Sequence, residues 1–241
     1  MEIIYLAAGR GSRLKKKTSN IPKCLVEINN KTILDYNLDF LFKFQKINIV
    51  TGYKSSKIIE KYNRCKKKIN FIVNKKFKTT NMVHSMFLVK PSFKNIFICY
   101  GDIIFDHNLY KKIKNNKTPD YIFVNSNWLN FWKQRMSKKR IMIDAETLDI
   151  DRYNNIQSIG NKIKNKLPKY QFMGLIKLTK KNFIKLKKIY LNLDKKIDFT
   201  SFVNHVINSK LINFKALKTS CYWFEIDTQK DIKIAKKYLI D

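Results

Sequence analysis

Cysteine is the first residue type that this sequence uses sparingly. The chain has 4 cysteines, spread over positions 24, 65, 99 and 221, with no Cys-x-x-Cys pair and no neighbouring cluster of histidines. This spacing argues against a zinc site and against a disulfide framework. It fits a reducing compartment, so we expect a cytoplasmic protein.

Long apolar runs and low-complexity segments are also missing. The first apolar run ends at Ala8 without the pattern of a secretion signal, and no uninterrupted apolar stretch is long enough to cross a bilayer. With only 6 Gly and 4 Pro, no flexible linker or internal repeat divides the 241 residues. We therefore predict one soluble domain over residues 1–241, without membrane insertion.

Acidic residues are few beside the basic ones. The chain contains 18 Asp+Glu against 50 Lys+Arg, which gives a formal charge of +32. Such a charge ordinarily points to nucleic acid, an acidic membrane surface or a polyanionic substrate. The lysines, however, are scattered through almost every segment, and no nucleic-acid-binding motif accompanies them. We expect no nucleic-acid partner, with a basic nucleic-acid-binding protein as the alternative outside the enzymes. A positive field would favour capture of a nucleoside triphosphate.

Short β-forming runs alternate with helical patterns in the first part of the chain. Strands are predicted at Ile3–Leu6, Ile47–Val50 and Ile69–Val73, and helices at 31–44 and 55–62. A lysine run before the third strand reads as a solvated connection. The order β-α-β-α-β predicts an α/β fold with a Rossmann-like, doubly wound, mainly parallel sheet.

Later segments extend this pattern. Further strands are predicted at Ile96–Tyr100, Tyr121–Val124 and Lys169–Leu178. Between the last two, Asp144–Glu146 and Ile156–Gly160 look like the strands of a small β-rich lobe. We expect this lobe to stand apart from the main sheet.

The loop after the first strand has the composition of a phosphate-binding loop. Open α/β sheets bind ligands at the carboxyl ends of their strands. Glycines bring backbone N–H groups close to phosphate oxygens, and Arg13 and Lys23 add cationic donors. The spacing excludes the ATPase P-loop and the dinucleotide fingerprint, and a tight turn is the simpler alternative. We predict nucleotide binding by Leu6, Ala7, Ala8, Gly9, Arg10, Gly11 and Ser12.

Other strand ends and one helix extend the predicted nucleotide site. Gly52 and Tyr53 follow the second strand, and Gly101 follows the strand that ends at Tyr100. Asn81 and Ser85 lie four apart, so one helical face could present their polar groups to a base, although capping would explain the same spacing. We predict that this set also contacts the nucleotide: Gly52, Tyr53, Asn81, Ser85 and Gly101.

Two carboxylates stand at strand ends far apart in the chain. Asp102 follows Gly101, and Asp227 ends the apolar run that begins at Tyr222. A carboxylate exposed at such a place is where a hard divalent cation can meet a phosphate. An Asx turn is the alternative for Asp102. We predict that Asp102 and Asp227 hold one Mg²⁺.

Aromatic residues predict a second ligand pocket. Trp128 and Trp132 lie four apart in a helical segment and could line an acceptor pocket, even a quaternary-ammonium cage, although such stripes more often belong to the core. Later aromatics and carboxylates favour a small cationic or zwitterionic ligand. The predicted acceptor-binding set is Trp128, Trp132, Arg135, Tyr170, Phe172, Asp198 and Glu225.

These motifs together resemble the sugar-nucleotidyltransferase superfamily, which has a Rossmann-like core. The resemblance covers nearly the whole chain and is carried by Leu6–Leu14, Pro22–Leu25, Gly101-Asp102 and Glu225–Asp227. The details are similar to the bacterial phosphocholine-cytidylyltransferase-like branch, in the segments Asn81–Ser85, Asn127–Arg135, Asp144–Glu146, Gln171–Leu175 and Trp223–Thr228.

The resemblance implies an enzyme that uses CTP and Mg²⁺. An acceptor phosphate would attack the α-phosphorus of CTP, and pyrophosphate would leave. The implied acceptor is a small phosphorylated head group, such as phosphocholine, an aminoalkylphosphonate or a phosphorylated amino-acid amide, destined for surface polysaccharides. The implied catalytic residues are Lys23, Arg13, Asp102 and Asp227.

The resemblance also implies a division of the chain and leaves alternatives open. We expect a core of about residues 1–125 and 170–241 and an acceptor-binding subregion of about 126–169, in a protein that could form a homo-oligomer. A sugar-1-phosphate acceptor, or UTP, dTTP or GTP as donor, is the enzyme alternative. The chain lacks room for the large accessory domain of many sugar-specific relatives, which weakens the case for a sugar.

Overall fold

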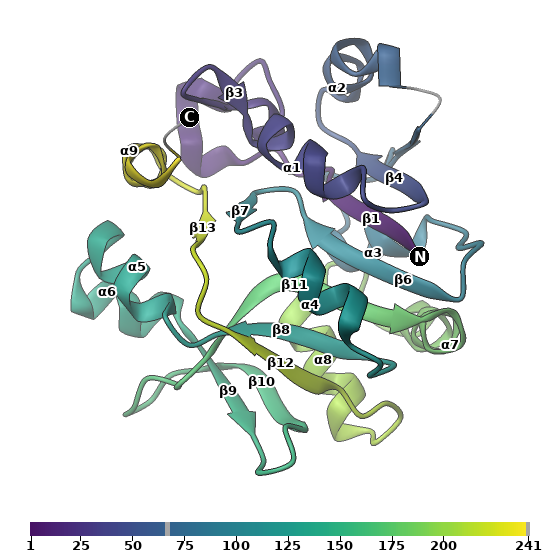
Figure 1. Ribbon diagram of the computed structural model, residues 1–241, viewed down its shortest axis with the longest axis vertical. Coiled ribbons are helices and arrows are strands. Elements are labelled where there is room, and N and C mark those ends of the chain that lie inside the picture. The colour runs from purple at the N-terminus through teal and green to yellow at the C-terminus, as the bar shows by residue number, and fades with distance from the viewer. Residues whose placement is uncertain (66–67, 240–241) are drawn as a thin grey trace.

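A seven-stranded sheet forms the centre of the computed structural model, which describes residues 1–65 and 68–239 (Figure 1). Strand β11 runs antiparallel to both of its neighbours, and the other pairs are parallel. This confirms the predicted α/β fold with a mainly parallel sheet. The strand order is β12 (Lys215–Thr219), β8 (Tyr121–Asn125), β11 (Gln171–Thr179), β6 (Asn95–Tyr100), β1 (Glu2–Ala7), β4 (Lys46–Thr51) and β5 (Ile69–Val73).

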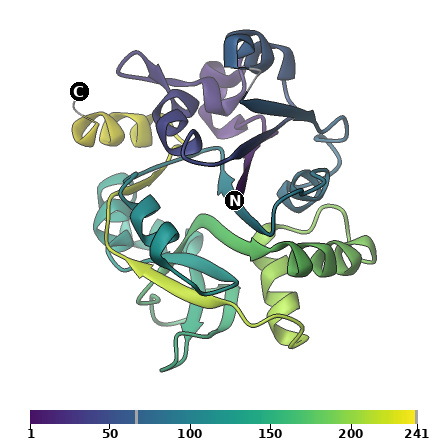
Figure 2. The ribbon, with the colours of Figure 1, turned by 45° about the vertical axis from the view of Figure 1, so that its right-hand side comes forward.

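Helices cover both faces of this sheet, as the doubly wound prediction requires (Figures 1 and 2). Along β1, Ile3 and Tyr5 enter one hydrophobic core, whereas Ile4 and Leu6 enter the other, because side chains alternate across a strand. The first core is closed by α1 (Ile33–Leu41), α2 (Ser55–Lys61) and α4 (Leu109–Asn115), and the second by α3 (Met82–Phe87), α7 (Lys180–Leu191) and α8 (Phe199–Asn208).

Side-chain caps set the starts of several helices. The Thr32 hydroxyl accepts from the Asp35 N–H at 3.0 Å, and the Asp35 carboxylate accepts from the Thr32 N–H at 2.9 Å, which forms a reciprocal capping box at α1. Asp198 caps α8 by accepting from the Ser201 N–H at 2.8 Å. Thr and Asp are both favoured at this position, so the sequence itself marks the starts of α1 and α8.

Residues 126–169 leave the main sheet. They form α5 (Trp128–Arg135), α6 (Lys138–Asp144) and an antiparallel hairpin of β9 (Glu146–Ile150) and β10 (Ile156–Lys162), which packs on α8. We expected a strand to begin at Asp144, and this was wrong. Asp144 ends α6, which begins after Ser137 because the Ser137 hydroxyl accepts from the Arg140 N–H at 3.4 Å.

No helix among the described residues has the length and apolar composition that a membrane crossing requires. The lysine run expected to be a solvated connection falls partly on residues 66 and 67, which lie outside the described residues. Several short elements and one further helix complete the fold. They are η1 (Ser12–Thr18), η2 (Lys23–Leu25), η3 (Asn63–Cys65), β2 (Glu27–Ile28), β3 (Lys31–Thr32), β7 (Ile103–Phe105), β13 (Trp223–Glu225) and α9 (Gln229–Tyr238).

Two close backbone approaches bring distant strand ends together. The Gly101 N–H donates to the Leu6 carbonyl at 3.0 Å, which holds the end of β6 against the end of β1. A Cβ at Gly101 would lie 2.4 Å from that carbonyl oxygen, so this position has no room for a side chain. Strand β13 pairs with β7, and the Ile226 N–H donates to the Asp102 carbonyl at 2.9 Å. The segments that carry Asp102 and Asp227 therefore lie side by side.

The tight contact at Gly101 predicts that Gly101→Ala is destabilising. The added methyl group meets backbone rather than a flexible side chain, so the strands must shift, at a cost of about 1–3 kcal/mol in the free energy of unfolding. Urea denaturation measures this. Gly9→Ala is the matched control, because nothing lies within 4 Å of its Cβ position. Equal unfolding midpoints for the two variants would contradict the prediction.

Candidate active site

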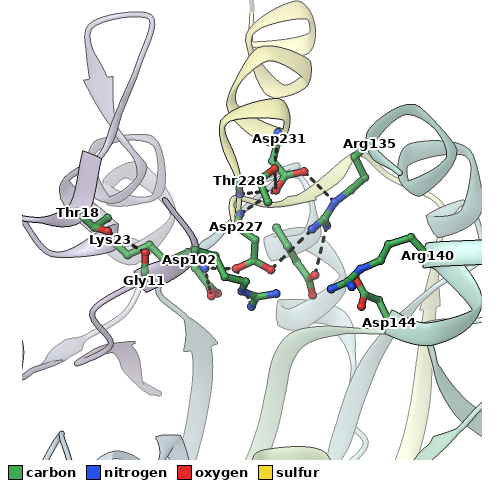
Figure 3. A network of polar contacts seen from close by, with 12 residues as sticks. Gly11, Thr18, Lys23, Asp102, Arg135, Arg140, Asp144, Asp227, Thr228 and Asp231 are labelled. Atoms are coloured by element: carbon green, nitrogen blue, oxygen red, sulfur yellow. Dashed lines mark hydrogen bonds and ion pairs between the residues drawn. The ribbon is translucent and has the colours of Figure 1, made fainter. Parts of the chain in front are cut away.

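The ammonium group of Lys23 lies between two carboxylates (Figure 3). Its Nζ is 2.7 Å from Asp102 Oδ2 and 2.5 Å from Asp227 Oδ1, and only 10% of the Lys23 side chain is exposed. Lys23 comes from η2, Asp102 follows β6, and Asp227 follows β13. The structure thus brings together the predicted catalytic lysine and both predicted metal ligands.

Asp227 collects positive charge from three side chains. Besides Lys23, Arg13 Nη2 lies 3.0 Å from its Oδ1, and Arg135 Nη2 lies 3.7 Å from its Oδ2. Burial acts to raise the pKa of Asp227, but Lys23, then Arg13 and Arg135, outweigh burial and lower it. Burial acts to lower the pKa of Lys23, but Asp102 and Asp227 raise it overall. Lys23 and Asp227 are therefore both charged at neutral pH.

A cavity opens beside this cluster at the carboxyl ends of β1 and β6. Seven residues of the predicted nucleotide set line it, together with Lys23 and Asp102: Leu6, Ala7, Ala8, Gly9, Asn81, Ser85 and Gly101. Asn81 also caps α3, where its side chain accepts from the Met82 N–H at 2.8 Å. The cavity therefore places the predicted phosphate loop against the ion cluster.

The other predicted nucleotide residues lie next to this lining. Gly11 has a φ of +69° and packs on the Lys23 side chain, where a Cβ would come within 2.8 Å of the Lys23 Cβ. The Tyr53 N–H donates to the Ala8 carbonyl at 3.1 Å, and the Arg10 guanidinium lies 5.5 Å from the centre of the Tyr53 ring. Ser12 begins η1, and Gly52 packs on Ala8. These residues lie in the phosphate loop or in contact with it, outside the lining of the cavity.

Sequence reasoning missed a polar group in the same cavity. Asn74 is 2% exposed, and its Nδ2 donates to Thr80 Oγ1 at 3.1 Å and to Ser85 Oγ at 3.0 Å. Asn74, Thr80 and the ring of Phe77 all line the cavity. One signal was present, because Asn74 directly follows strand β5 and so lies at the same edge of the sheet as the phosphate loop.

A second cavity, of about 320 Å³, adjoins the first across the ion cluster. Met82 lines both cavities, and Arg13 and Asp227 line the second. Its walls are aromatic and acidic. Five of the seven predicted acceptor residues line it: Trp132, Arg135, Phe172, Asp198 and Glu225.

Trp128 and Tyr170 lie elsewhere, which corrects our expectation for both. Trp128 is 1% exposed, and its Nε1 donates to the Pro168 carbonyl at 3.3 Å, so it supports the ring of Trp132 from inside the core. Tyr170 precedes β11 and lies against the ammonium of Lys218, 5.2 Å from the ring centre. Neither residue lines the second cavity.

The second cavity concentrates acidic residues in a very basic protein. It is lined by 5 of the 18 carboxylates of the chain: Asp144, Glu146, Asp198, Glu225 and Asp227. Glu146, which sequence reasoning left out of the site, shares the Thr200 hydroxyl with Asp198, at 3.1 Å and 3.0 Å. Among the described residues, no basic side chain forms an ion pair with either. Burial raises the pKa of Glu146 and, against Arg135, raises the pKa of Glu225 to about 7.

Comparison with known proteins identifies the family. A family model described as "MobA-like NTP transferase domain" matches residues 3–141. The chain belongs to this family. It is a nucleotidyltransferase, as the resemblance predicted.

Individual relatives are similar to this nucleotidyltransferase over most of its length. It is 31% identical over 255 residues to the CTP:phosphoglutamine cytidylyltransferase of Campylobacter jejuni, covering 97% of this chain and 98% of that protein. It is 28% identical over 154 residues to the choline-phosphate cytidylyltransferase of Streptococcus pneumoniae, covering 61% and 65%. The inositol-1-phosphate CTP transferase of T. maritima has the same fold, with a TM-score of 0.76 at 22% identity over 98% and 95% of the two chains.

The ion cluster predicts a pH-dependent effect of Lys23→Met. Without the ammonium, Asp102 and Asp227 face each other in a partly buried place, and unfolding at pH 7 should become easier by about 2–4 kcal/mol. The pKa of Asp227 is lowered in the folded protein, so its contribution to stability is present at neutral pH and is lost as the pH falls through that lowered pKa. The difference between variant and wild type should therefore shrink on acidification.

Urea denaturation between about pH 2 and pH 8 measures this effect, because the lowered pKa of Asp227 places its titration below the usual range of an aspartate. Lys177→Met is the matched control, because Lys177 is also buried but its Nζ donates to the Thr118 carbonyl at 3.0 Å rather than to a carboxylate. A constant stability difference for Lys23→Met across this pH range would show that the two carboxylates do not depend on the ammonium.

Proposed function

We propose that this protein is a CTP-dependent cytidylyltransferase that joins CMP to a small phosphorylated head group, releases pyrophosphate and serves surface polysaccharide modification. The observation that carries the proposal is the position of the ion cluster, between a cavity with a phosphate loop and a cavity with aromatic and acidic walls. The named activities of the relatives support CTP as the donor. The proposed acceptors are phosphocholine, an aminoalkylphosphonate or a phosphorylated amino-acid amide.

Asp102 and Asp227 are the proposed ligands of Mg²⁺. Their carboxylates converge on one point, and Mg²⁺ is commonly held by one or two carboxylates together with water and substrate phosphates. Among the described residues, no group of three or more His, Cys, Asp or Glu side chains is gathered as a metal cage, so phosphate oxygens would complete the coordination. When bound, the metal supplies charge neutralisation where two phosphate groups meet.

The charge of the cluster is consistent with a need for a cation. The cationic side chains Lys23, Arg13 and Arg135 are linked to four carboxylates, so three positive charges face at most four negative ones. Because the pKa of Glu225 lies at about 7, the cluster has no net positive charge with which to hold a triphosphate beside a phosphorylated acceptor. The four carboxylates belong to Asp102, Glu225, Asp227 and Asp231.

The proposed reaction depends on positioning and on charge. An acceptor phosphate oxygen attacks the α-phosphorus of CTP, and the bond to pyrophosphate breaks. The acceptor phosphate is already ionised near neutral pH, so the reaction needs no general base. Lys23, which is charged at neutral pH, would stabilise the α-phosphoryl oxygens, and Arg13, whose side chain is 65% exposed, can turn to the leaving pyrophosphate.

The second cavity supports a cationic or zwitterionic acceptor. Aromatic faces attract a ligand cation, and here they stand beside the carboxylates of Glu146 and Asp198, which lack a basic partner among the described residues. Unpaired carboxylates are notable in a chain of formal charge +32, where basic partners are plentiful. A sugar-1-phosphate could offer these carboxylates hydroxyl hydrogen bonds but no positive charge.

A pyrophosphate-release screen tests the proposed function. We expect release only with CTP, a divalent cation and a phosphorylated acceptor that carries an ammonium group. The screen combines CTP, UTP, GTP, ATP and dTTP with phosphocholine, aminoethylphosphonate, phosphorylated glutamine and sugar-1-phosphates. Activity confined to UTP, dTTP or GTP with a sugar phosphate would overturn the choice of donor and acceptor. Binding of oligonucleotides without any release would favour a nucleic-acid-binding protein instead.

Glu146→Gln should weaken acceptor binding without affecting CTP. Loss of one charge-assisted interaction predicts a rise of about tenfold in the acceptor KM, with the KM for CTP unchanged. Because burial raises the pKa of Glu146, acidification should protonate it and raise the acceptor KM of the wild type; the variant should lose this part of the rise and keep the part due to Glu225, whose pKa is about 7. Steady-state kinetics at several pH values measure both effects. Asp149→Asn, on the same strand but outside the cavity lining, is the control, and equal behaviour of the two variants would refute the role of Glu146.

A further inference from the structure

A buried carboxylate at the start of the terminal helix connects the two sides of the site. Asp231 is 3% exposed, and its Oδ2 accepts from the Thr228 N–H at 2.7 Å, the Thr228 hydroxyl at 2.9 Å and the Asp227 N–H at 3.0 Å. Its Oδ1 lies 2.8 Å from Arg135 Nε (Figure 3). One carboxylate therefore holds the backbone of Asp227 and the side chain of Arg135 at the same time.

Arg135 keeps donor capacity after it has bound Asp231. Its terminal nitrogens lie 3.5 Å from Glu225 Oε2 and 3.7 Å from Asp227 Oδ2, beyond the length of about 2.7–2.9 Å typical of a charge-assisted hydrogen bond. The guanidinium lies over the Trp132 ring, 5.4 Å from its centre, and only 10% of the side chain is exposed. The guanidinium is thus held in place, and its terminal nitrogens can still donate hydrogen bonds to a ligand.

The position of this fork indicates what it can bind. Arg135 lines the second cavity together with Asp227, a proposed metal ligand, and with Glu146 and Asp198, the two acidic residues that no basic side chain pairs with among the described residues. A planar guanidinium matches two oxygens of a phosphate, whereas the acidic wall suits the cationic end of an acceptor. A zwitterionic acceptor would therefore lie with its phosphate toward Arg135 and its ammonium toward Glu146.

We propose that Asp231 is a positioning residue that aims Arg135 at the acceptor phosphate and fixes Asp227 beside it. The proposal rests on the proposed function and adds the orientation of the acceptor and the residue that sets it. Because both contacts of Asp231 come from one carboxylate, the distance between the phosphate-binding arginine and the proposed metal ligand is fixed by a single side chain. Asp231 itself touches neither substrate.

Asp231→Asn tests this role. If the amide turns its N–H toward Arg135 Nε, which is itself a donor, Arg135 is misaligned; if it keeps its oxygen there, the N–H groups of Thr228 and Asp227 lose their acceptor and Asp227 is misaligned. We expect the KM for the acceptor to rise about tenfold or more, with the KM for CTP changed less than about twofold. Asp35→Asn is the matched control, because Asp35 makes the same capping box at α1 and an ion pair of 3.4 Å with Lys61, away from the site. It should lower stability and leave both KM values unchanged.

Arg135 variants show whether Asp231 acts through the guanidinium. Arg135→Ala should lose acceptor affinity and regain part of it when guanidinium chloride is added at millimolar concentration, whereas Asp35→Asn should not respond. The acceptor KM of the double variant Asp231→Asn with Arg135→Ala should be no higher than that of Arg135→Ala alone. Independent, additive effects would mean that Asp231 does not work through Arg135.

Binding of inorganic phosphate tests this inference independently of the proposed function. Calorimetric binding of phosphate should weaken about tenfold in Asp231→Asn and in Arg135→Ala, and stay unchanged in Glu146→Gln and Asp35→Asn. This measurement does not require turnover. If the wild type transfers CMP to no acceptor, the proposed function fails while the phosphate titration still tests Arg135. If Asp231→Asn only loses stability, as Asp35→Asn does, with acceptor KM and phosphate affinity intact, Asp231 is merely a helix cap and the inference is overturned.

Discussion

The ammonium of Lys23 and its two carboxylates form the interaction on which the rest of the site depends. The partners lie 79 and 204 residues away in the chain, and the lysine side chain is almost fully removed from water. A buried ammonium is costly unless oppositely charged groups meet it closely, so the loop after β1, the end of β6 and the end of β13 must all arrive at one place. The Gly101 contact with Leu6 and the pairing of β13 with β7 provide this arrangement.

The distribution of charge gives the protein two opposite local environments. The excess of lysine is spread over the whole chain, whereas a large share of its few acids gathers around one cavity. The general field would attract a polyanionic donor, and the local acidic wall would attract the cationic part of the proposed acceptor. The ion cluster lies where these two environments meet. The acidic environment would not follow from the net charge alone.

Much of the fold was predictable because its signals are local. Strands β1, β4, β5 and β6 are β-forming runs, and Thr32 and Asp198 cap α1 and α8. Asp102 and Asp227 could be chosen as candidates because both follow strands, but their meeting depends on the pairing of β13 with β7, which the sequence does not show. The roles of other residues depend on tertiary contacts. Trp128 and Trp132 have the same spacing signal, but the indole of Trp128 bonds Pro168 inside the core. Glu146, Asn74 and Asp231 read as ordinary polar residues until their neighbours are known.

The order of the chain has a consequence for its synthesis. Lys23 and Asp102 are made early, but Asp227, Asp231 and helix α9 lie close to the C-terminal end of the described residues. A ribosome releases these last segments only after the strands that form the phosphate loop have emerged. A nascent chain can therefore begin to shape its nucleotide cavity while one of the two carboxylates beside Lys23 is still missing. The ion cluster around Lys23 is thus completed only when Asp227 emerges, after the strands of the main sheet.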